Sequence, residues 1–172
     1  WDVVIVRHIL EHSHDTHGFL LSLKELVSED GYLVMEVPDF TQCLNSKDYS
    51  FLWEEHIVYF TPNTLSVAIE GAGLGVHYFG NYPYHFENSL VVVAGKKPMS
   101  SSSVPGGPRE DVTQDFGKMF DDSKKIAQER FRLMQAQGPI AIFGAGHLAC
   151  KFINFFGLED FIEFVVDDHP QK

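Results

Sequence analysis

The feature that most constrains the fold is a strand-helix-strand pattern at the start of the chain. Residues 1–6, Trp-Asp-Val-Val-Ile-Val, form a nearly continuous apolar run, which is typical of a strand buried on both faces of a parallel sheet. Residues 18–27 carry apolar side chains at helical spacing, and residues 31–37 form a second apolar strand that Pro38 closes. This order predicts an α/β fold with a parallel pair of strands.

The middle of the chain predicts one more helix and two more strands. Thr61 followed by Pro62 resembles an N-cap with proline in the first helical position, and the helix is expected to end near Gly71. Strand-like runs follow at residues 76–82 and 89–94. The connection between them is short, so we expect an antiparallel pair.

A segment rich in Ser, Gly and Pro, residues 98–108, predicts a boundary between two domains. Apolar strand patterns lie at both ends of the sequence and there is no initiator Met, so we interpret the sequence as part of a longer chain. The predicted parts are a first domain over residues 1–97, a linker over residues 98–120 and a second domain over residues 121–172.

Charge and cysteine content narrow the possible partners. The formal net charge is -11 and no cluster of Lys or Arg occurs, which argues against nucleic acid and against an anionic membrane. No apolar run approaches the roughly 20 residues of a membrane-spanning helix. Cys43 and Cys150 lie far apart and form no CxxC pair, so neither a disulfide framework nor a structural zinc site is indicated. We therefore expect a cytoplasmic protein.

The string from His8 to His12, His-Ile-Leu-Glu-His, matches the inverted zinc-protease pattern HxxEH. In that pattern two histidines one helical turn apart hold the metal and the glutamate activates water. Here the motif directly follows a predicted strand, and Asp15 and Gly18 interrupt any long helix that would carry it. We therefore prefer another interpretation.

Several segments together resemble the class I methyltransferases. Residues 2–12 look like their fourth strand and the following loop, residues 29–38 like the fifth strand, and the antiparallel pair like strands six and seven. Residues 53–61, Trp-Glu-Glu-His-Ile-Val-Tyr-Phe-Thr, resemble the EHxxYF segment of the sugar C-methyltransferase family. Residues 144–149, Gly-Ala-Gly-His-Leu-Ala, resemble the opening of that family's C-terminal Rossmann-like domain.

The resemblance implies an activity and a cofactor. Such an enzyme transfers a methyl group from S-adenosylmethionine to a carbon alpha to a ketone on a nucleotide-linked sugar. The sequence lacks the family's glycine-rich loop, the acidic residue that would hold the adenosine ribose, and the N-terminal zinc-binding module. We therefore expect this stretch alone to bind the cofactor weakly and to be inactive.

The catalytic residues are predicted from the chemistry together with the resemblance. Carbon methylation first requires a base that removes a proton next to a carbonyl group, and a histidine suits this role. His56 is the predicted base, with Glu55 orienting it or holding a sugar hydroxyl, and with Glu54 also beside it in sequence. His12 is expected to hold the keto oxygen or the enolate. The alternatives are a surface histidine at position 56 and a capping or loop histidine at position 12.

Other positions are candidates for binding. Arg7 and His8 would contact the methionine part of the cofactor, although a backbone turn with solvated side chains explains them equally well. Core packing is the alternative for the aromatic candidates, and a plain hairpin turn is the alternative for the two polar ones. The candidates for binding the sugar are Tyr59, Tyr84, Glu87 and Asn88.

The second domain is predicted to open with a helix up to Gln137, followed by strands at residues 140–143 and 162–166. Gly144, Gly146 and His147 lie in a GxGxxA motif directly after the first of these strands, and Asp167 follows about 23 residues after Gly144. This spacing is close to a dinucleotide-binding motif. The family resemblance instead implies that the unit helps to frame the nucleotide-sugar site without a redox cofactor.

The sequence is also compatible with two other functions. One is a non-catalytic module that binds a nucleotide sugar, and the other is an O- or N-methyltransferase on the same fold. We also expect self-association, because the strand at residues 2–6 would present an unpaired edge.

Overall fold

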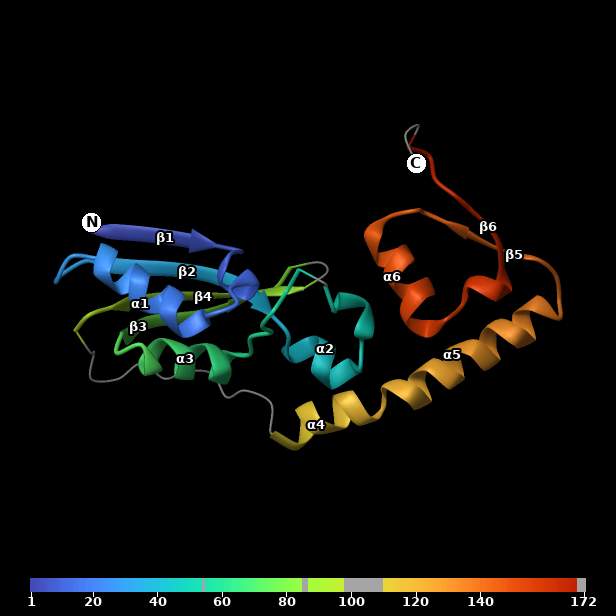
Figure 1. The fold of residues 1–172 in the computed structure, drawn as a ribbon, viewed down its shortest axis with the longest axis horizontal. Coiled ribbons are helices and arrows are strands. Elements are labelled where there is room, and N and C mark those ends of the chain that lie inside the picture. The colour runs from blue at the N-terminus through green and yellow to red at the C-terminus, as the bar shows by residue number, and fades with distance from the viewer. Residues whose placement is uncertain (54, 85–86, 98–109, 170–172) are drawn as a thin grey trace. The chain divides into compact units, whose positions relative to one another are not determined.

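The computed structural model describes residues 1–53, 55–84, 87–97 and 110–169 (Figure 1). The chain divides into two compact units. Unit 1 comprises Trp1–Ser46 and Trp53–Val112, and unit 2 comprises Lys47–Leu52 and Thr113–Lys172. Within the described residues, no helix is both long and apolar enough to cross a membrane.

Unit 1 is built on a mixed sheet with the strand order β1-β2-β4-β3 (Figure 1). β1 and β2 are parallel, and β4 is antiparallel to both of its neighbours. The predicted α/β class and the predicted antiparallel pair are therefore confirmed. The strands are β1 (Val3–Arg7), β2 (Tyr32–Asp39), β3 (Gly75–Tyr82) and β4 (Asn88–Gly95).

Two helices, α1 (Thr16–Leu26) and α3 (Pro62–Gly71), pack against one face of this sheet and share a single core with it. Asp15 accepts a hydrogen bond from the Gly18 amide at 2.9 Å, so α1 begins two residues before the predicted start. Thr61 caps α3 as predicted. The fully buried side chains at the centre of the core are Leu20, Leu33, Met35, Leu65, Ile69, Leu90 and Val92.

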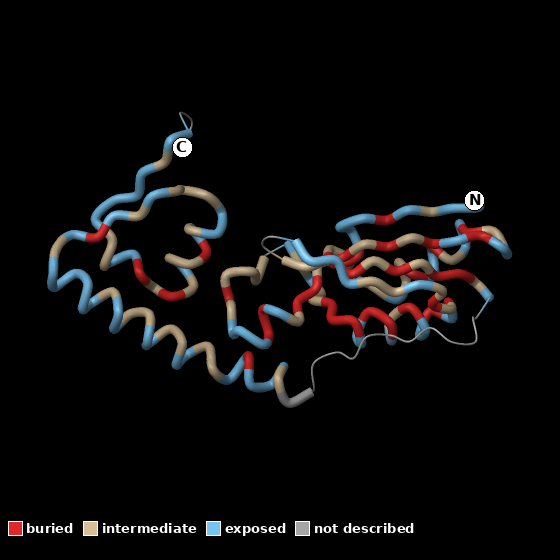
Figure 2. The backbone as a smooth tube through the Cα atoms, turned by 180° about the vertical axis from the view of Figure 1, so that it is seen from behind, coloured by how far each residue is buried: buried red, intermediate tan, exposed pale blue. Residues whose placement is uncertain are grey.

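The prediction that the first strand is buried on both faces is wrong. Val6 is buried, but Val3 and Ile5 are 52% and 65% exposed (Figure 2). Among the described residues, both helices that cover the sheet lie on one face, so alternate side chains of β1 point toward solvent. In the described part of the chain β1 pairs only with β2, which makes it an edge strand. β2 also continues through Pro38 to Asp39, beyond its predicted end.

Short elements follow β1 and β2. The 3-10 turn η1 (Leu10–His12) comes after β1, and the helix α2 (Thr41–Ser46) comes after β2. A second 3-10 turn, η2 (Tyr49–Phe51), belongs to unit 2. The HxxEH string thus begins directly after β1 and ends in a single 3-10 turn, not on a long helix.

Unit 2 contains the predicted strand-helix-strand motif, in which β5 and β6 are parallel and α6 connects them. Within the predicted linker, residues 98–120, Glu110–Lys118 form the helix α4. Phe116 on this helix is buried and packs on Tyr49, with ring centroids 4.4 Å apart. Residues 98–109 lie outside the described residues. The other elements are α5 (Phe120–Gln135), β5 (Ile140–Phe143), α6 (His147–Phe156), η3 (Glu159–Phe161) and β6 (Ile162–Val166).

Candidate functional site

The topology of unit 1 brings four chain segments to one edge of the sheet. β1, β2 and β3 run in the same direction, because β4 is antiparallel to both β2 and β3. The carboxyl ends of these three strands and the start of β4 therefore share an edge. Ligands of open α/β sheets bind at the carboxyl ends of the strands.

The turn after β1 places charged groups against the end of β2. Arg7 and Glu36 are register partners, and Nε of Arg7 donates to Glu36 at 2.5 Å. This hydrogen bond is the main cause that lowers the pKa of Glu36 and raises the pKa of Arg7, to which Tyr84 adds a small contribution. His8 has a positive φ of 50°, and its two ring nitrogens lie 3.4 Å from Glu36 and 3.5 Å from Glu11.

Glu11 connects this turn to the segment at residues 53–61. Its backbone carbonyl accepts hydrogen bonds from the amides of Ile57 at 2.8 Å and Val58 at 3.1 Å. Its side chain is buried, and neither carboxylate oxygen has a hydrogen-bond partner among the described residues. The two motifs that carry the family resemblance are therefore in direct contact.

His12 and His56 form the centre of the site. Nδ1 of His12 lies 2.8 Å from the backbone carbonyl of Glu55. A carbonyl oxygen only accepts, so Nδ1 is the donor and carries a proton. The rings of His12 and His56 meet edge to face, with centroids 4.9 Å apart. Two predicted catalytic residues thus lie side by side.

The aromatic surroundings of His56 are Trp53 and Tyr59, whose ring centroids lie 6.1 Å and 5.9 Å from its own. The hydroxyl of Tyr59 accepts from the amide of Trp53 at 2.8 Å and donates to its carbonyl at 3.0 Å. These bonds close the segment into a loop that presents His56. Glu55 has an exposed side chain and contributes its backbone carbonyl, and Glu54 lies outside the described residues.

A polar hollow of about 500 Å³ lies at the same edge of the sheet. Oδ1 of buried Asp39 accepts from the amide and the hydroxyl of Thr41 at 3.0 Å and 2.6 Å. Oδ2 of Asp39 accepts from Asn81 at 2.6 Å. Of the predicted sugar-binding residues, Asn88 lines the hollow, Glu87 beside it is half-buried, and Tyr84 is exposed. The lining residues are Asp39, Thr41, Gln42, Asn45, Ser46, Asn81 and Asn88.

The sequence interpretation missed the role of Asp39 and Asn81 in this hollow. The sequence did indicate Asp39 as a possible site residue, because ligands bind at the carboxyl ends of buried strands and this carboxylate lies at such an end. Asn81 gave no such signal, since it lies inside a strand and meets Asp39 only through the pairing of β3, β4 and β2.

The GxGxxA loop lies in unit 2. Gly144 has a φ of 104°, which favours glycine, and its amide donates to the Val166 carbonyl at 2.7 Å. The amide of Ala145 donates to Asp167 at 2.6 Å. Gly146 is the N-cap of α6, and His147 is its first residue. The carboxylate at the end of β6 thus holds the glycine loop.

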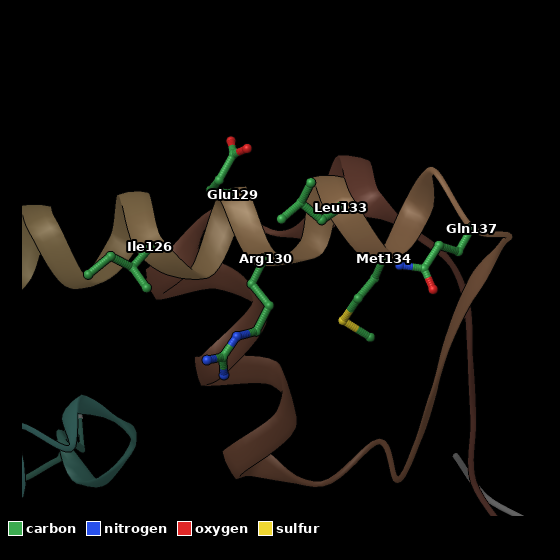
Figure 3. Close-up of a pocket in the computed structure, with 6 residues that line it drawn as sticks. All are labelled: Ile126, Glu129, Arg130, Leu133, Met134 and Gln137. Atoms are coloured by element: carbon green, nitrogen blue, oxygen red, sulfur yellow. The ribbon is translucent and has the colours of Figure 1, made fainter.

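Unit 2 also has a shallow apolar depression of about 370 Å³ along α5. Its side chains come from one helix and the residue two positions after its end (Figure 3). Among the described residues, no group of side chains that could hold a metal ion lies in it. The residues are Ile126, Glu129, Arg130, Leu133, Met134 and Gln137.

In a comparison with known proteins, residues 1–78 match a family model described as a methyltransferase domain. Over 74 residues the chain is 30% identical to the C-methyltransferase NovU of Streptomyces niveus, a match that covers 43% of this chain and 18% of NovU. The chain therefore spans less than two thirds of that relative. It is also similar to a solved structure of a single-residue variant of LepI in complex with SAH and a substrate analogue. That match has 13% identity and a TM-score of 0.42, and it covers 54% of this chain and 26% of the other.

The matched region contains β1, η1 and the segment at residues 53–61. His12 and His56 thus both fall within the part of the chain that is similar to a methyltransferase domain.

Proposed function

We propose that this chain belongs to an S-adenosylmethionine-dependent C-methyltransferase, which acts on a carbon alpha to the ketone of a nucleotide-linked sugar. The observation that carries the proposal is the contact between His12 and His56 at the carboxyl edge of the sheet, inside the region that matches a methyltransferase domain. The similarity to a protein named as a C-methyltransferase supports carbon as the acceptor.

The residues of this edge suit the charge of the cofactor. S-adenosylmethionine carries a sulfonium cation, and the edge holds the carboxylates of Glu11, Glu36 and Asp39. When bound, the cofactor supplies an electrophilic methyl group. Arg7 and His8, at the end of β1, are the proposed contacts to its methionine part.

His56 is the proposed base that removes the proton alpha to the ketone. Its ring is half-buried and lies between His12, Trp53 and Tyr59, so it is held in place but reachable from solvent. His12 is the proposed partner of the keto oxygen. Its Nδ1 is committed to the Glu55 carbonyl, so Nε2 is the nitrogen left for a ligand, and it donates to the keto oxygen when the ring carries a proton on both nitrogens. Glu55 therefore acts on His12 through its backbone.

The polar hollow at the same edge is the proposed place for sugar hydroxyl groups. Asn88 lines the hollow, and Tyr59, Tyr84 and Glu87 are the further candidate contacts. We propose that the loop of Gly144, Gly146 and His147 contacts the nucleotide.

We also propose that the protein works in the cytoplasm. Among the described residues, neither Cys43 nor Cys150 forms a disulfide, which supports a reducing compartment.

The test uses the full-length parent protein with S-adenosylmethionine, a nucleotide-linked ketosugar and deuterated water. The expected product carries the new methyl group on the alpha carbon in place of its proton, and deuterium enters the alpha position of ketosugar that is not yet methylated. Methyl transfer to oxygen or nitrogen without exchange would contradict carbon methylation and favour the O- or N-methyltransferase. Binding without transfer or exchange would favour the non-catalytic module.

A further inference from the structure

We infer that Glu11, His12 and His56 form a binding site for one divalent transition-metal ion of the Zn²⁺ type. Each residue offers one ligand atom, and these three atoms all lie within 4.8 Å of one another. One nitrogen from each of two histidines and one carboxylate oxygen make a donor set that Zn²⁺ accepts in proteins.

The distances need only a small adjustment to reach metal geometry. Nε2 of His12 lies 3.9 Å from Oε1 of Glu11, and the rings of His12 and His56 lie edge to face. Bonds of about 2.0–2.1 Å in a tetrahedral site put ligand atoms about 3.4 Å apart. The three atoms now lie within 4.8 Å of one another, and metal binding requires side-chain rotations that bring them to about 3.4 Å.

The second, independent observation is the state of the Glu11 carboxylate. Glu11 is only 2% exposed, and neither of its carboxylate oxygens has a hydrogen-bond partner among the described residues. A buried charge without hydrogen bonds is unfavourable unless a cation compensates it. His8 lies 3.5 Å from Glu11, but its ring is 44% exposed and it is also close to Glu36, so it does not satisfy this carboxylate.

The tautomer of His12 also favours a cation at this site. Its Nδ1 donates to the Glu55 carbonyl, so in the neutral ring Nε2 carries a lone pair. That lone pair lies near Oε1 of Glu11, which also only accepts, and a cation between them relieves the repulsion. Histidine ligands of metals characteristically donate their other ring nitrogen to a backbone carbonyl or a carboxylate.

This site differs from the zinc-protease pattern that the string His8–His12 matches. In that pattern both histidines of the string hold the metal and the glutamate activates water. Here Glu11 is a ligand, and the third ligand is His56, which lies 44 residues after His12 in the sequence. The arrangement therefore predicts metal binding without protease activity.

If the proposed function is correct, a bound metal ion prevents His56 from acting as the base. A histidine nitrogen that holds the ion has no lone pair left for a proton, so His56 cannot be ligand and base at once. We expect the metal-loaded parent to exchange the alpha proton of the ketosugar more slowly than the metal-free parent.

The test of the site itself uses this chain without a histidine tag, freed of metal with a chelator, and needs neither cofactor nor sugar. Co²⁺ is titrated and the visible absorption bands are recorded, and Zn²⁺ is then titrated by calorimetry. The expected result is one ion per chain, with Co²⁺ bands of tetrahedral or five-coordinate geometry and displacement of Co²⁺ by Zn²⁺.

Variants identify the ligands. His12→Ala, His56→Ala and Glu11→Gln should each weaken Zn²⁺ binding at least tenfold. Glu11→Gln keeps the shape of the side chain, so its fold, checked by circular dichroism, separates loss of a ligand from loss of structure. His14→Ala and His17→Ala are the matched controls, since both histidines are exposed in the same stretch of chain. They should leave the affinity within twofold.

Absence of one-to-one binding, or equal losses in the control variants, would overturn the site. Methyl transfer by the metal-free parent is a separate measurement. Its failure would count against the proposed function and leave the metal site standing.

Discussion

Nδ1 of His12 donates a hydrogen bond of 2.8 Å to the backbone carbonyl of Glu55, across 43 positions in the sequence. Together with the bonds from Ile57 and Val58 to the carbonyl of Glu11, it joins the turn after β1 to the loop that presents His56. The geometry of the candidate site therefore depends on backbone groups that hold the two motifs together.

Asp39→Ala should lower the free energy of unfolding by about 2–3 kcal/mol, because it leaves the Thr41 amide and the Asn81 side chain without their buried acceptor. Urea denaturation of the chain measures the change. Asp30→Ala, at an exposed position, is the control and should cost well under about 1 kcal/mol. A loss at Asp39 no larger than that of the control would show that its hydrogen bonds contribute little.

Glu36 should make stability depend on pH. The hydrogen bond from Arg7 lowers its pKa below the ordinary value of 4.5, so the folded state binds a proton less readily than the unfolded state. The stabilisation is present above that value and is lost as pH falls through the lowered pKa. The free energy of unfolding of the unmodified chain should therefore approach that of Glu36→Gln in acid.

Arg7→Met provides the matched background for this measurement. Because Arg7 is the main cause of the shift, Glu36→Gln should change the pH dependence much less when Arg7 is absent. The same pH dependence in both backgrounds would mean that another group holds the carboxylate.

Tyr49→Phe should destabilise unit 2 by about 1–2 kcal/mol. The buried Tyr49 hydroxyl donates to the carbonyl of Phe116 at 2.8 Å, and its loss leaves that carbonyl unsatisfied. The free energy of unfolding in urea gives the cost. Tyr32→Phe, at an exposed tyrosine, should have almost no effect. Equal effects of the two substitutions would argue against packing of α4 on η2.

Ile5→Lys should reduce self-association. Ile5 is 65% exposed on the edge strand β1, and a charge on an edge strand opposes pairing with a second copy. Light scattering of the purified chain is expected to show dimers or larger species that this substitution shifts toward monomer. Val67→Lys, at a 61% exposed position of α3, is the control. A purely monomeric unmodified chain would contradict the prediction.

Local patterns were enough to predict most elements of unit 1, because apolar periodicity and caps such as Thr61 act over a few residues. They were not enough for properties set by distant contacts. The exposure of Ile5 depends on what covers the sheet, and the helix α4 is held by Tyr49 from far along the chain.

The same holds for the candidate site. The residue types and the two motifs indicated His12 and His56 as candidates for the site, and their rings do meet in the structure. The burial of Glu11 and the use of the Glu55 backbone were not readable from sequence, since both arise only when the two motifs pack together.

The most direct test of the central claim is exchange of the alpha proton of a nucleotide-linked ketosugar in deuterated water, followed by NMR with the metal-free full-length parent and its His56→Ala variant. The account predicts that the parent exchanges this proton and that the variant is slower by at least about a hundredfold, the usual contribution of a positioned base. Equal exchange rates would contradict the assignment of His56 as the base. A product whose new methyl group is bonded to oxygen or nitrogen would contradict carbon methylation itself.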